Sequence, residues 1–444
     1  MGDRPTIFAL SSAPGRAAIA VVRVSGTRAG AVIDQMAPPR PIDRMSGVRR
    51  IRHPESGETL DQGVIIWLAG PKTDTSEDIA EFHVHGGTAI VRSVLSAIGS
   101  LPGCRLAEPG EFTRRAFENG KIDLAQAEAR ADLVDAETEA QRRQALRQMS
   151  GALSSLYDGW RSQLIEASSL VETAIDFSDE LDVANVALDR SHELARNLRA
   201  AIAAHFEDGN RGEILREGFR VVLAGAPNVG KSSLLNALAR RDAAIVSEEE
   251  GTTRDVIEVR LDLEGLPVVI SDTAGIRDAQ EGSVEREGVR RTLASARDAE
   301  FVIWLSDATV PEVKPPGEIA DRGEGVLHVA NKIDLLNASK TCCNGLAISA
   351  KTGAGIDGLS GRLASLARER IGDVEAPPIT RARHRENLST CLASLDTFLS
   401  SVPGEIELRA EDLRRATYAL GRITGRVDVE DLLGQVFSRF CIGK

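Results

Sequence analysis

A glycine-rich segment in the second half of the chain combines residue types that bind phosphate. Gly225, Gly230, Lys231 and Ser232 have the spacing Gly-x-x-x-x-Gly-Lys-Ser, directly after the apolar run Phe219–Ala224. Glycines let main-chain amides turn toward phosphate oxygens, and the helix expected to follow presents its positive end. The lysine adds a point charge near the β and γ phosphates, and the serine hydroxyl suits Mg²⁺. The segment therefore predicts a nucleotide-phosphate site.

Two further motifs follow in the order that a nucleotide switch requires. The loop 251–255 reads Gly-Thr-Thr-Arg-Asp, and its Thr253 can complete the Mg²⁺ shell and sense the γ-phosphate. The run Asp272-Thr273-Ala274-Gly275 ends an apolar strand, which places Asp272 near the metal and the Gly275 amide near the γ-phosphate. This arrangement predicts a loop pair that responds to the presence of the γ-phosphate.

A third motif selects the base. Asn331-Lys332-Ile333-Asp334 follows the strand-like run Val326–Ala330. An ionised Asp334 offers two acceptor oxygens that match two adjacent N–H donors of guanine, a pair that adenine lacks. Ser349-Ala350-Lys351 supplies the supporting loop. GTP is therefore the predicted nucleotide.

The residue that orients the attacking water is not fixed by the motifs themselves. Small GTPases such as Ras carry a glutamine just after Asp-x-x-Gly, and Ile276 occupies that place here. The polar candidates nearby are Arg277, Glu285, Arg286 and Glu287. Asn228, inside the phosphate loop, offers an amide oxygen for a monovalent cation that would add positive charge beside the phosphates.

The elements that must position these residues indicate a multidomain chain, α/β plus all-α. Residues 1–118 read as a mixed α/β domain, with apolar runs at 6–10, 17–24, 63–68 and 79–84 and a helix at 88–98. No proline lies between Pro109 and Pro227, which favours long helices. Short apolar runs then alternate with helical segments, as in a mainly parallel sheet, and the chain is helical again after Pro378. The predicted domains are 1–118, 119–212, 213–373 and 374–444, with the P-loop nucleotide domain inserted in a helical domain built from both flanks.

Bulk composition excludes several classes of protein. The 444 residues are 42% hydrophobic and 27% charged, and no apolar run is long enough to cross a bilayer. Five cysteines without paired spacing favour a reducing compartment, so a cytoplasmic location is expected. The net charge of −12 gives no overall attraction to nucleic acid, so any RNA contact must be local.

The full set of motifs resembles the MnmE-type (TrmE-type) tRNA modification GTPases. The resemblance covers essentially the whole chain and is carried by PGRAAIAVVRVSG, EFHVHGG, PGEFTRRAFENGKIDLAQAEA, GAPNVGKSSLLNAL, GTTRD, DTAGIR and FCIGK. It implies a homodimer with an N-terminal folate-binding-like domain, a helical domain and an inserted G domain. It also implies a heterotetramer with an FAD-using MnmG (GidA)-type partner. Together these proteins would add an aminomethyl or carboxymethylaminomethyl group to carbon 5 of the wobble uridine of certain tRNAs, with a tetrahydrofolate derivative as one-carbon donor.

The resemblance also implies roles for individual residues. It implies K⁺-stimulated hydrolysis with K⁺ held in the region of Asn228, Ser247, Glu249 and Thr252, and Mg²⁺ at Ser232 and Thr253. Glu285 takes the water-orienting role, with Arg277 as a further catalytic candidate, and Cys441 takes the place of the family's reactive C-terminal thiol. Folate contacts map to Arg23, Glu81, Lys121 and Lys444. Contacts to GTP are expected from Asn228, Val229, Gly230, Lys231, Ser232, Ser233, Ser247, Thr252, Thr253, Asp272, Thr273, Ala274, Gly275, Asn331, Lys332, Asp334, Ser349 and Ala350.

Other readings of the sequence stay open at this point. The chain could be a G protein that acts as a timed binding module, for example in ribosome assembly, or a folate-dependent transferase in which the G domain only regulates. His83 and His85 share one strand face and could begin a zinc site, although no His or Cys cluster completes it. The arginine-rich segments 142–143, 381–385 and 414–415 could contact tRNA or simply form solvated helix faces.

Overall fold

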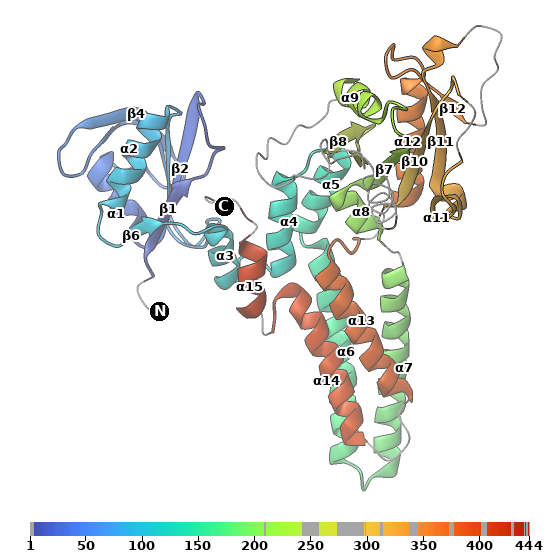
Figure 1. Ribbon diagram of the computed structural model, residues 1–444. Coiled ribbons are helices and arrows are strands. Elements are labelled where there is room, and N and C mark those ends of the chain that lie inside the picture. The colour runs from blue at the N-terminus through green and yellow to red at the C-terminus, as the bar shows by residue number, and fades with distance from the viewer. Residues whose placement is uncertain are drawn as a thin grey trace, which may run out of the picture. The chain divides into compact units, whose positions relative to one another are not determined.

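The computed structural model falls into two compact units, which are described one at a time (Figure 1). It describes residues 4–207, 210–241, 257–272, 297, 299–310, 314–336, 345–372, 377–400, 406–427, 430–438, 440 and 443. The strands are β1 (Thr6–Leu10), β2 (Ile19–Ser25), β3 (Ser46–Arg52), β4 (Thr59–Leu68), β5 (Ile79–His85), β6 (Cys104–Leu106), β7 (Phe219–Gly225), β8 (Ile257–Leu263), β9 (Leu266–Asp272), β10 (Phe301–Asp307), β11 (Val326–Asn331) and β12 (Leu346–Ala347).

The helices are named in the same chain order. They are α1 (Ala29–Met36), α2 (Thr88–Gly99), α3 (Glu111–Glu118), α4 (Leu124–Val134), α5 (Glu139–Met149), α6 (Ala152–Asp176), α7 (Leu181–Glu207), α8 (Arg211–Glu217), α9 (Lys231–Arg241), α11 (Gly317–Ala320), α12 (Ile356–Ile371), α13 (Ala382–Ser400), α14 (Ile406–Thr424) and α15 (Glu430–Phe437).

The first unit, residues 1–131, 149–165 and 417–444, contains a six-stranded sheet in the order β3-β4-β5-β2-β1-β6. All neighbouring strands are antiparallel except β1 and β6. Strand residues alternate in orientation, so Val22, Val24 and Phe82 point to one face, where α1 and α2 cover them. Arg23 of β2 and Glu81 of β5 point to the opposite face.

Helices from distant parts of the sequence also pack within this unit. Leu124 and Ala127 of α4 form a buried cluster with Leu433 and Phe437 of α15 and with Phe440. Gly110, just before α3, has a φ of +68° and lies so close to α15 that an added Cβ would be 2.8 Å from the Phe437 carbonyl oxygen. The C-terminal segment is therefore part of the core of the first unit.

The second unit, residues 132–148 and 166–416, contains a six-stranded sheet in the order β12-β11-β10-β7-β9-β8. Every neighbouring pair is parallel except β8 and β9. Apolar residues of α8, α9 and α12 pack against this sheet and form one large core with it. The carboxyl ends of β7, β9, β10 and β11 lie at one edge, where ligands bind in such sheets.

Long helices that flank this sheet in the sequence pack on one another. Ser191 of α7 donates to the carbonyl oxygen of Ala167 in α6 at 2.9 Å. The rings of His192 and Phe398 lie 4.9 Å apart, which joins α7 to α13. Helical segments from both sides of the nucleotide motifs thus form one helical layer within this unit.

Most predicted elements are confirmed by the structure. The apolar runs of the sequence correspond to β1, β2, β4, β5 and β7 to β11 within a few residues, and the helix predicted at 88–98 is α2. No prediction covered α1, α11, β3, β6 or β12, of which β6 and β12 are only three and two residues long. Among the described residues, no helix combines the length and apolar character that crossing a bilayer requires.

Candidate functional site

The predicted phosphate loop connects β7 to α9 at the carboxyl edge of the second sheet. Its two motif glycines occupy positions where a side chain does not fit. Gly225 passes so close to β10 that an added Cβ would be 2.2 Å from the Leu305 carbonyl oxygen. Gly230 has a φ of +96°, and an added Cβ would be 2.4 Å from Nδ2 of Asn331. The loop therefore needs glycine at 225 because the Leu305 main chain is so close, and at 230 because of the left-handed backbone beside the Asn331 side chain.

Lys231 and Ser232 begin α9 and point their polar atoms back toward the loop and the next strand. The Lys231 ammonium donates to the carbonyl oxygens of Gly225 and Ala226 at 2.9 and 3.0 Å. Burial lowers the pKa of Lys231 from its ordinary value. The Ser232 hydroxyl donates to Oδ2 of Asp272, which ends β9, at 3.2 Å. One cation, one hydroxyl and one buried carboxylate thus meet at the start of this helix.

Hydrogen bonds join the predicted base-recognition loop, residues 331–334, to the phosphate loop. Asn331, which is buried, donates from Nδ2 to the Val229 carbonyl oxygen at 2.8 Å and accepts from the Ala350 amide at 2.9 Å. The Lys332 ammonium donates to the Asn228 carbonyl oxygen at 2.7 Å. Two hydrogen bonds from side chains of the base-recognition loop to main-chain carbonyls therefore join it to the phosphate loop, and a third joins it to the loop that contains Ala350.

Asp334 lies exposed beside the third predicted loop. The hydroxyl of Ser349, which is fully buried, donates to Oδ1 of Asp334 at 2.6 Å. The Thr352 amide donates to the same hydroxyl oxygen at 3.1 Å. Since hydrogen bonds on either side fix Ser349, the Asp334 carboxylate is held in an orientation that solvent or a ligand can reach.

The structure brings these predicted GTP contacts together and leaves others outside its described residues. Asn228, Val229, Gly230, Lys231, Ser232, Ser233, Asp272, Asn331, Lys332, Asp334, Ser349 and Ala350 all belong to the carboxyl edge of the second sheet. The predictions that fall outside the described residues are Ser247, Glu249, Thr252, Thr253, Thr273, Ala274, Gly275, Arg277, Glu285, Cys441 and Lys444.

The sequence analysis did not single out Asp307, which ends β10 at the same edge. Its Oδ2 accepts from the Lys332 ammonium at 2.7 Å, and its Oδ1 accepts from the amide and hydroxyl of Thr309. Burial raises the pKa of Asp307, but the hydrogen bonds from Lys332 and Thr309 outweigh burial and hold the pKa below its ordinary value. The signal that could have found it is an acidic residue at the end of a buried strand in a parallel sheet.

Two of the predicted folate residues are neighbours in the first unit. Arg23 and Glu81 are register partners on β2 and β5, and the Arg23 guanidinium donates to Oε1 of Glu81 at 2.9 and 3.0 Å. His83 lies 3.1 Å from the other Glu81 oxygen. Asp74 lies 3.9 Å from Arg23 and pairs with Arg130 at 2.8 Å. Lys121 is exposed just after α3, and no contact in the described residues joins it to this pair.

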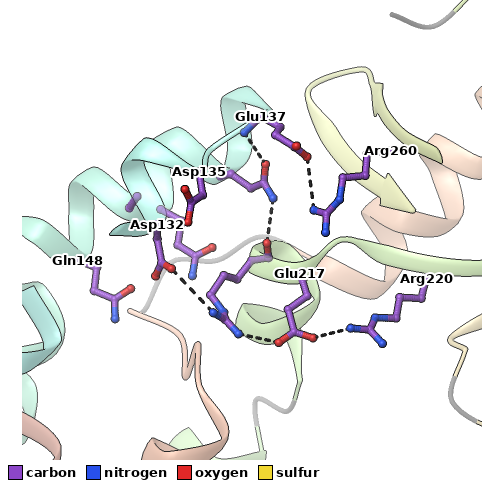
Figure 2. A pocket seen from close by; sticks show the side chains of 11 residues that line it. Asp132, Asp135, Glu137, Gln148, Glu217, Arg220 and Arg260 are labelled. Atoms are coloured by element: carbon purple, nitrogen blue, oxygen red, sulfur yellow. Dashed lines mark hydrogen bonds and ion pairs between the residues drawn. The ribbon is translucent and has the colours of Figure 1, made fainter. Parts of the chain in front are cut away.

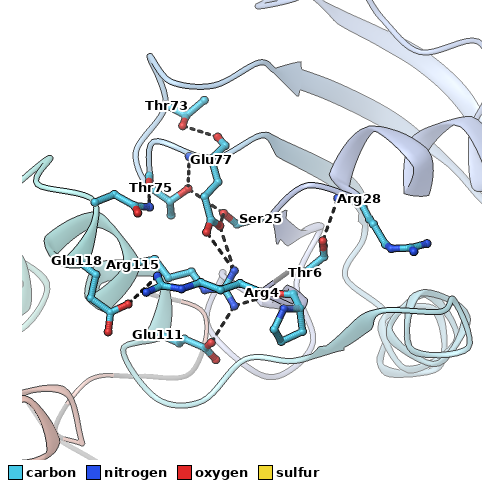
Figure 3. Close-up of polar contacts among 12 residues, drawn as sticks. Arg4, Thr6, Ser25, Arg28, Thr73, Thr75, Glu77, Glu111, Arg115 and Glu118 are labelled. Atoms are coloured by element: carbon cyan, nitrogen blue, oxygen red, sulfur yellow. Dashed lines mark hydrogen bonds and ion pairs between the residues drawn. The ribbon is translucent and has the colours of Figure 1, made fainter. Parts of the chain in front are cut away.

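A second polar cluster in the first unit is buried and links its helices to its sheet (Figure 3). Arg115 of α3 is 3% exposed, and its guanidinium lies 3.1 Å from Glu77 and 3.0 Å from Glu111. It also donates to the Pro5 carbonyl oxygen at 2.8 Å. Ser25 of β2 donates to Glu77 at 2.8 Å. Every charge of this cluster is met by another protein group, which indicates a structural role.

A cavity of about 520 Å³ lies in the second unit beside α5, α8 and β8 (Figure 2). Each of its three arginines pairs with a carboxylate of the lining: Arg216 and Arg220 with Glu217 at 2.6 and 3.0 Å, and Arg260 with Glu137 at 3.5 Å. Three buried glutamines of α5 form much of the opposite wall: Gln141, Gln144 and Gln148. Each arginine of the lining thus already has a carboxylate partner, so the cavity lacks the unpaired positive charge that marks a phosphate site.

The zinc and arginine-patch alternatives find little support in the described residues. His85 lies 2.9 Å from Asp61, and His83 lies 3.1 Å from Glu81, so each imidazole faces a carboxylate. No group of three metal-ligating side chains occurs in the described part of the chain. Arginines of the three patches pair with nearby carboxylates, as in Arg142 with Glu139, Arg381 with Asp132 and Arg414 with Glu172.

Comparisons with known proteins cover the chain from end to end. A family model described as the N-terminus of the GTP-binding protein TrmE matches residues 6–121, and a model of the MnmE helical domain matches residues 124–441. The tRNA modification GTPase MnmE of Methylobacterium radiotolerans is 50% identical over 450 residues, which cover 100% of both chains. The protein of the same name from Maricaulis maris is 49% identical over 442 residues, which cover 99% of both chains. The one from Methylorubrum populi is 52% identical over 441 residues, which cover 99% of this chain and 98% of that protein.

Proposed function

The chain belongs to the MnmE family of tRNA modification GTPases, and from this premise we propose which residues bind GTP and which cofactors and partners the enzyme uses. It is a GTP hydrolase of that family. The proposed complete activity is K⁺-stimulated GTP hydrolysis coupled to the addition of a (carboxymethyl)aminomethyl group at carbon 5 of the wobble uridine of certain tRNAs. The proposed partner is an FAD-dependent MnmG (GidA)-type protein, and the proposed one-carbon donor is a tetrahydrofolate derivative.

The nucleotide proposal rests on the hydrogen bonds that hold three loops together at the carboxyl edge of the second sheet. The phosphate loop presents amides at the start of α9 together with the partly buried Lys231 ammonium, and both stabilise negative phosphate oxygens. Asp334 is exposed and oriented by Ser349, as an acceptor for two guanine N–H groups must be. Asn331 of the base-recognition loop donates a hydrogen bond to the Val229 carbonyl oxygen of the phosphate loop. These loops are the proposed GTP site.

The proposed Mg²⁺ ligand in the described residues is Ser232, with Thr253 as a second ligand outside them. The chemistry of the donor set fits the ion, because the Ser232 hydroxyl and the Asp272 carboxylate are hard oxygen groups only 3.2 Å apart. When bound, Mg²⁺ neutralises charge on the β and γ phosphates. Within the chain, Lys231 stabilises the same charges and Asp272 orients the serine hydroxyl.

K⁺ is proposed to bind at Asn228 with Ser247, Glu249 and Thr252, of which only Asn228 is described. Asn228 is exposed and has a φ of +62°, and its carbonyl oxygen already faces the Lys332 ammonium. The neutral side-chain amide oxygen that remains suits a monovalent cation, which supplies positive charge beside the phosphates. Glu285 is proposed to orient the attacking water, with Arg277 as a further catalytic residue. Rates of GTP hydrolysis in KCl and NaCl should differ by about an order of magnitude, whereas equal rates contradict the K⁺ proposal.

The folate proposal assigns Arg23, Glu81, Lys121 and Lys444. The described pair fits a ligand that has both ring N–H donors and a carboxylate tail, because Glu81 accepts hydrogen bonds and arginine binds carboxylate in a fork. Glu81→Gln should weaken binding of a tetrahydrofolate derivative without changing GTP hydrolysis. Unchanged folate affinity in that variant rules out the assignment of Glu81.

Assembly and boundaries complete the proposal. The proposed domains are an N-terminal domain at 1–118 that mediates homodimerisation, a helical domain from 119–212 and 374–444, and a G domain at 213–373. The homodimer is proposed to form a heterotetramer with its MnmG-type partner, to act on tRNA in the cytoplasm, and to use Cys441 as a reactive thiol. In cells, Cys441→Ser should keep GTP hydrolysis and lose the wobble-uridine modification, and normal levels of the modified nucleoside contradict the thiol role.

The experiment that tests the GTP site exchanges Asp334 for asparagine. The variant replaces two ionised acceptors with one carbonyl and one N–H group, so GTP should bind at least tenfold more weakly. Xanthosine triphosphate has a carbonyl where guanine has its amino group, so it should bind the variant better than the wild type. Fluorescent nucleotide titration measures both affinities, and unchanged GTP affinity contradicts the assignment.

A further inference from the structure

The contact between the base-recognition loop and the phosphate loop depends on one flexible side chain. Lys332 has a four-carbon stem and an ammonium group with three donors, so it has no preferred direction of its own. Its ammonium nevertheless lies 2.7 Å from the Asn228 carbonyl oxygen and 2.7 Å from Oδ2 of Asp307. A carboxylate on one side and a carbonyl on the other therefore define where this charge lies.

Asp307 is itself held in place. The Thr309 amide donates to its Oδ1 at 2.9 Å, and the Thr309 hydroxyl donates to the same oxygen at 2.6 Å. Asp307 is the register partner of Asn331 across β10 and β11, and the next residue, Ala308, donates its amide to the Asn331 carbonyl oxygen at 2.8 Å. The carboxylate thus has one oxygen anchored to its own loop and the other available to Lys332.

The two residues that this contact joins both have left-handed backbones. Asn228 has a φ of +62° and Lys332 a φ of +68°. This conformation is unfavourable for a residue with a side chain, less so for asparagine, and it persists only where surrounding contacts hold it. The Lys332 ammonium bridges one such turn to the other, so the direction of that ammonium affects both turns.

We propose that Asp307 is a positioning residue for guanine nucleotides, which holds the Lys332 ammonium against the Asn228 carbonyl and so makes the base-recognition loop and the phosphate loop one preorganised site. The inference rests on the proposed GTP site and adds a residue that none of the nucleotide motifs contains. Asp307 acts through Lys332 and does not itself touch the nucleotide.

The test is a double-mutant cycle on the full-length protein with GDP as the probe. Asp307→Ala should weaken GDP binding about tenfold, because Lys332 loses the partner that directs it. Lys332→Ala should weaken it by as much or more. In the Lys332→Ala background, Asp307→Ala should add less than a twofold further loss, because the two residues act as a unit. Isothermal titration up to millimolar GDP measures all four affinities.

Controls separate positioning from a general effect on folding. Asp321→Asn changes an exposed carboxylate that follows α11 in the same unit, and it should leave GDP affinity unchanged. Asp307→Glu, which keeps the charge, should recover part of the affinity that Asp307→Ala loses. Wild-type affinity in Asp307→Ala overturns the inference, as does a double variant whose loss is the product of the two single losses. Wild-type protein that binds no GDP with magnesium present would instead refute the proposed GTP site.

Discussion

The two units hold their polar side chains in different ways. In the second sheet, polar residues stand at the carboxyl ends of strands, and most of their contacts go to the main chain of neighbouring loops, as with Asn331 and Lys231. In the first unit, the Arg115 guanidinium of α3 pairs directly with the carboxylates of Glu77 and Glu111. One arrangement orders loops around a space for a ligand, and the other neutralises its own charges.

This difference distinguishes a ligand-binding site from a network of charged groups that only stabilises the fold. A binding site keeps charged groups that a ligand can pair with, as at Asp334. Its loops also need glycine where the backbone is left-handed, as at Gly230. A structural network satisfies its groups internally, so a change there affects folding before it affects binding.

Arg115→Met should destabilise the first unit by about 3 kcal/mol or more, because it leaves the Glu77 and Glu111 carboxylates short of a buried partner. Urea unfolding followed by a probe in this unit measures the loss. The matched control is Arg114→Met, one residue earlier on α3, where an exposed guanidinium pairs with Glu118 and should contribute less than about 1 kcal/mol. Equal effects of the two variants contradict the structural role of the buried cluster.

Lys231→Met should have the opposite pattern, with a large loss of binding and little loss of stability. The ammonium is the principal side-chain cation at the phosphate loop, so GTP affinity should fall about 100-fold, or about 2.7 kcal/mol. Burial already lowers the pKa of Lys231, so removing its charge relieves desolvation and should leave unfolding nearly unchanged.

The control for Lys231 is Lys314→Met, which removes an exposed ammonium of the same unit and should change neither quantity. Nucleotide titration and thermal unfolding are measured on the same preparations. If Lys231→Met instead unfolds the protein at lower temperature and binds GTP normally, the proposed contrast between the nucleotide loops of the second unit and the Arg115 cluster of the first unit is wrong.

Sequence reasoning reached the strands and the motif residues of the second unit because each signal there is local. Gly225, Lys231 and Asp334 are recognisable from spacing alone, and apolar runs such as Phe219–Ala224 predict the strands that position them. Where signals are short or polar, as in β3 and β6, the pattern is too weak to identify a strand.

Contacts between segments far apart in the sequence could not be predicted in this way. The Asp307 and Lys332 pair depends on which strands are neighbours in the sheet, and the Arg115 cluster joins residues 38 positions apart. The pairing of Arg23 with Glu81 follows only from the register of β2 and β5. Sequence patterns identify elements, whereas the side-chain partners of a charge come from topology and register.

Gly225→Ala should cost about 2 kcal/mol of stability in the second unit, because the new methyl group meets the Leu305 carbonyl oxygen at a distance that requires the backbone to move. Nucleotide affinity should fall as well, since the same main chain forms the phosphate loop. Gly361→Ala in α12 is the control: an added Cβ there meets nothing within 4 Å, and alanine should raise stability by up to about 1 kcal/mol. Similar losses in both variants contradict the close-packing explanation.

The smallest expected effect is a pH dependence of the first unit that comes from Glu111. Burial raises the pKa of Glu111, but hydrogen bonds from Arg105, the Glu108 amide and Arg115 outweigh it and hold the pKa below its ordinary value of 4.5. The unfolded chain therefore takes up the proton first as pH falls. Glu111 adds stability above the ordinary carboxyl range, and that stability is lost as pH falls through the lower pKa of the folded state.

The difference in unfolding free energy between wild type and Glu111→Gln isolates this contribution. It should be constant between pH 6 and 8 and should shrink below about pH 4.5, where the wild-type carboxylate begins to be protonated in the unfolded state. Asp123, whose pKa burial raises in the same unit, acts in the opposite direction, but it is common to both proteins and cancels from the difference. A difference that grows on acidification contradicts the self-neutralised network, because Glu111 would then be destabilised as a carboxylate rather than stabilised by its arginines.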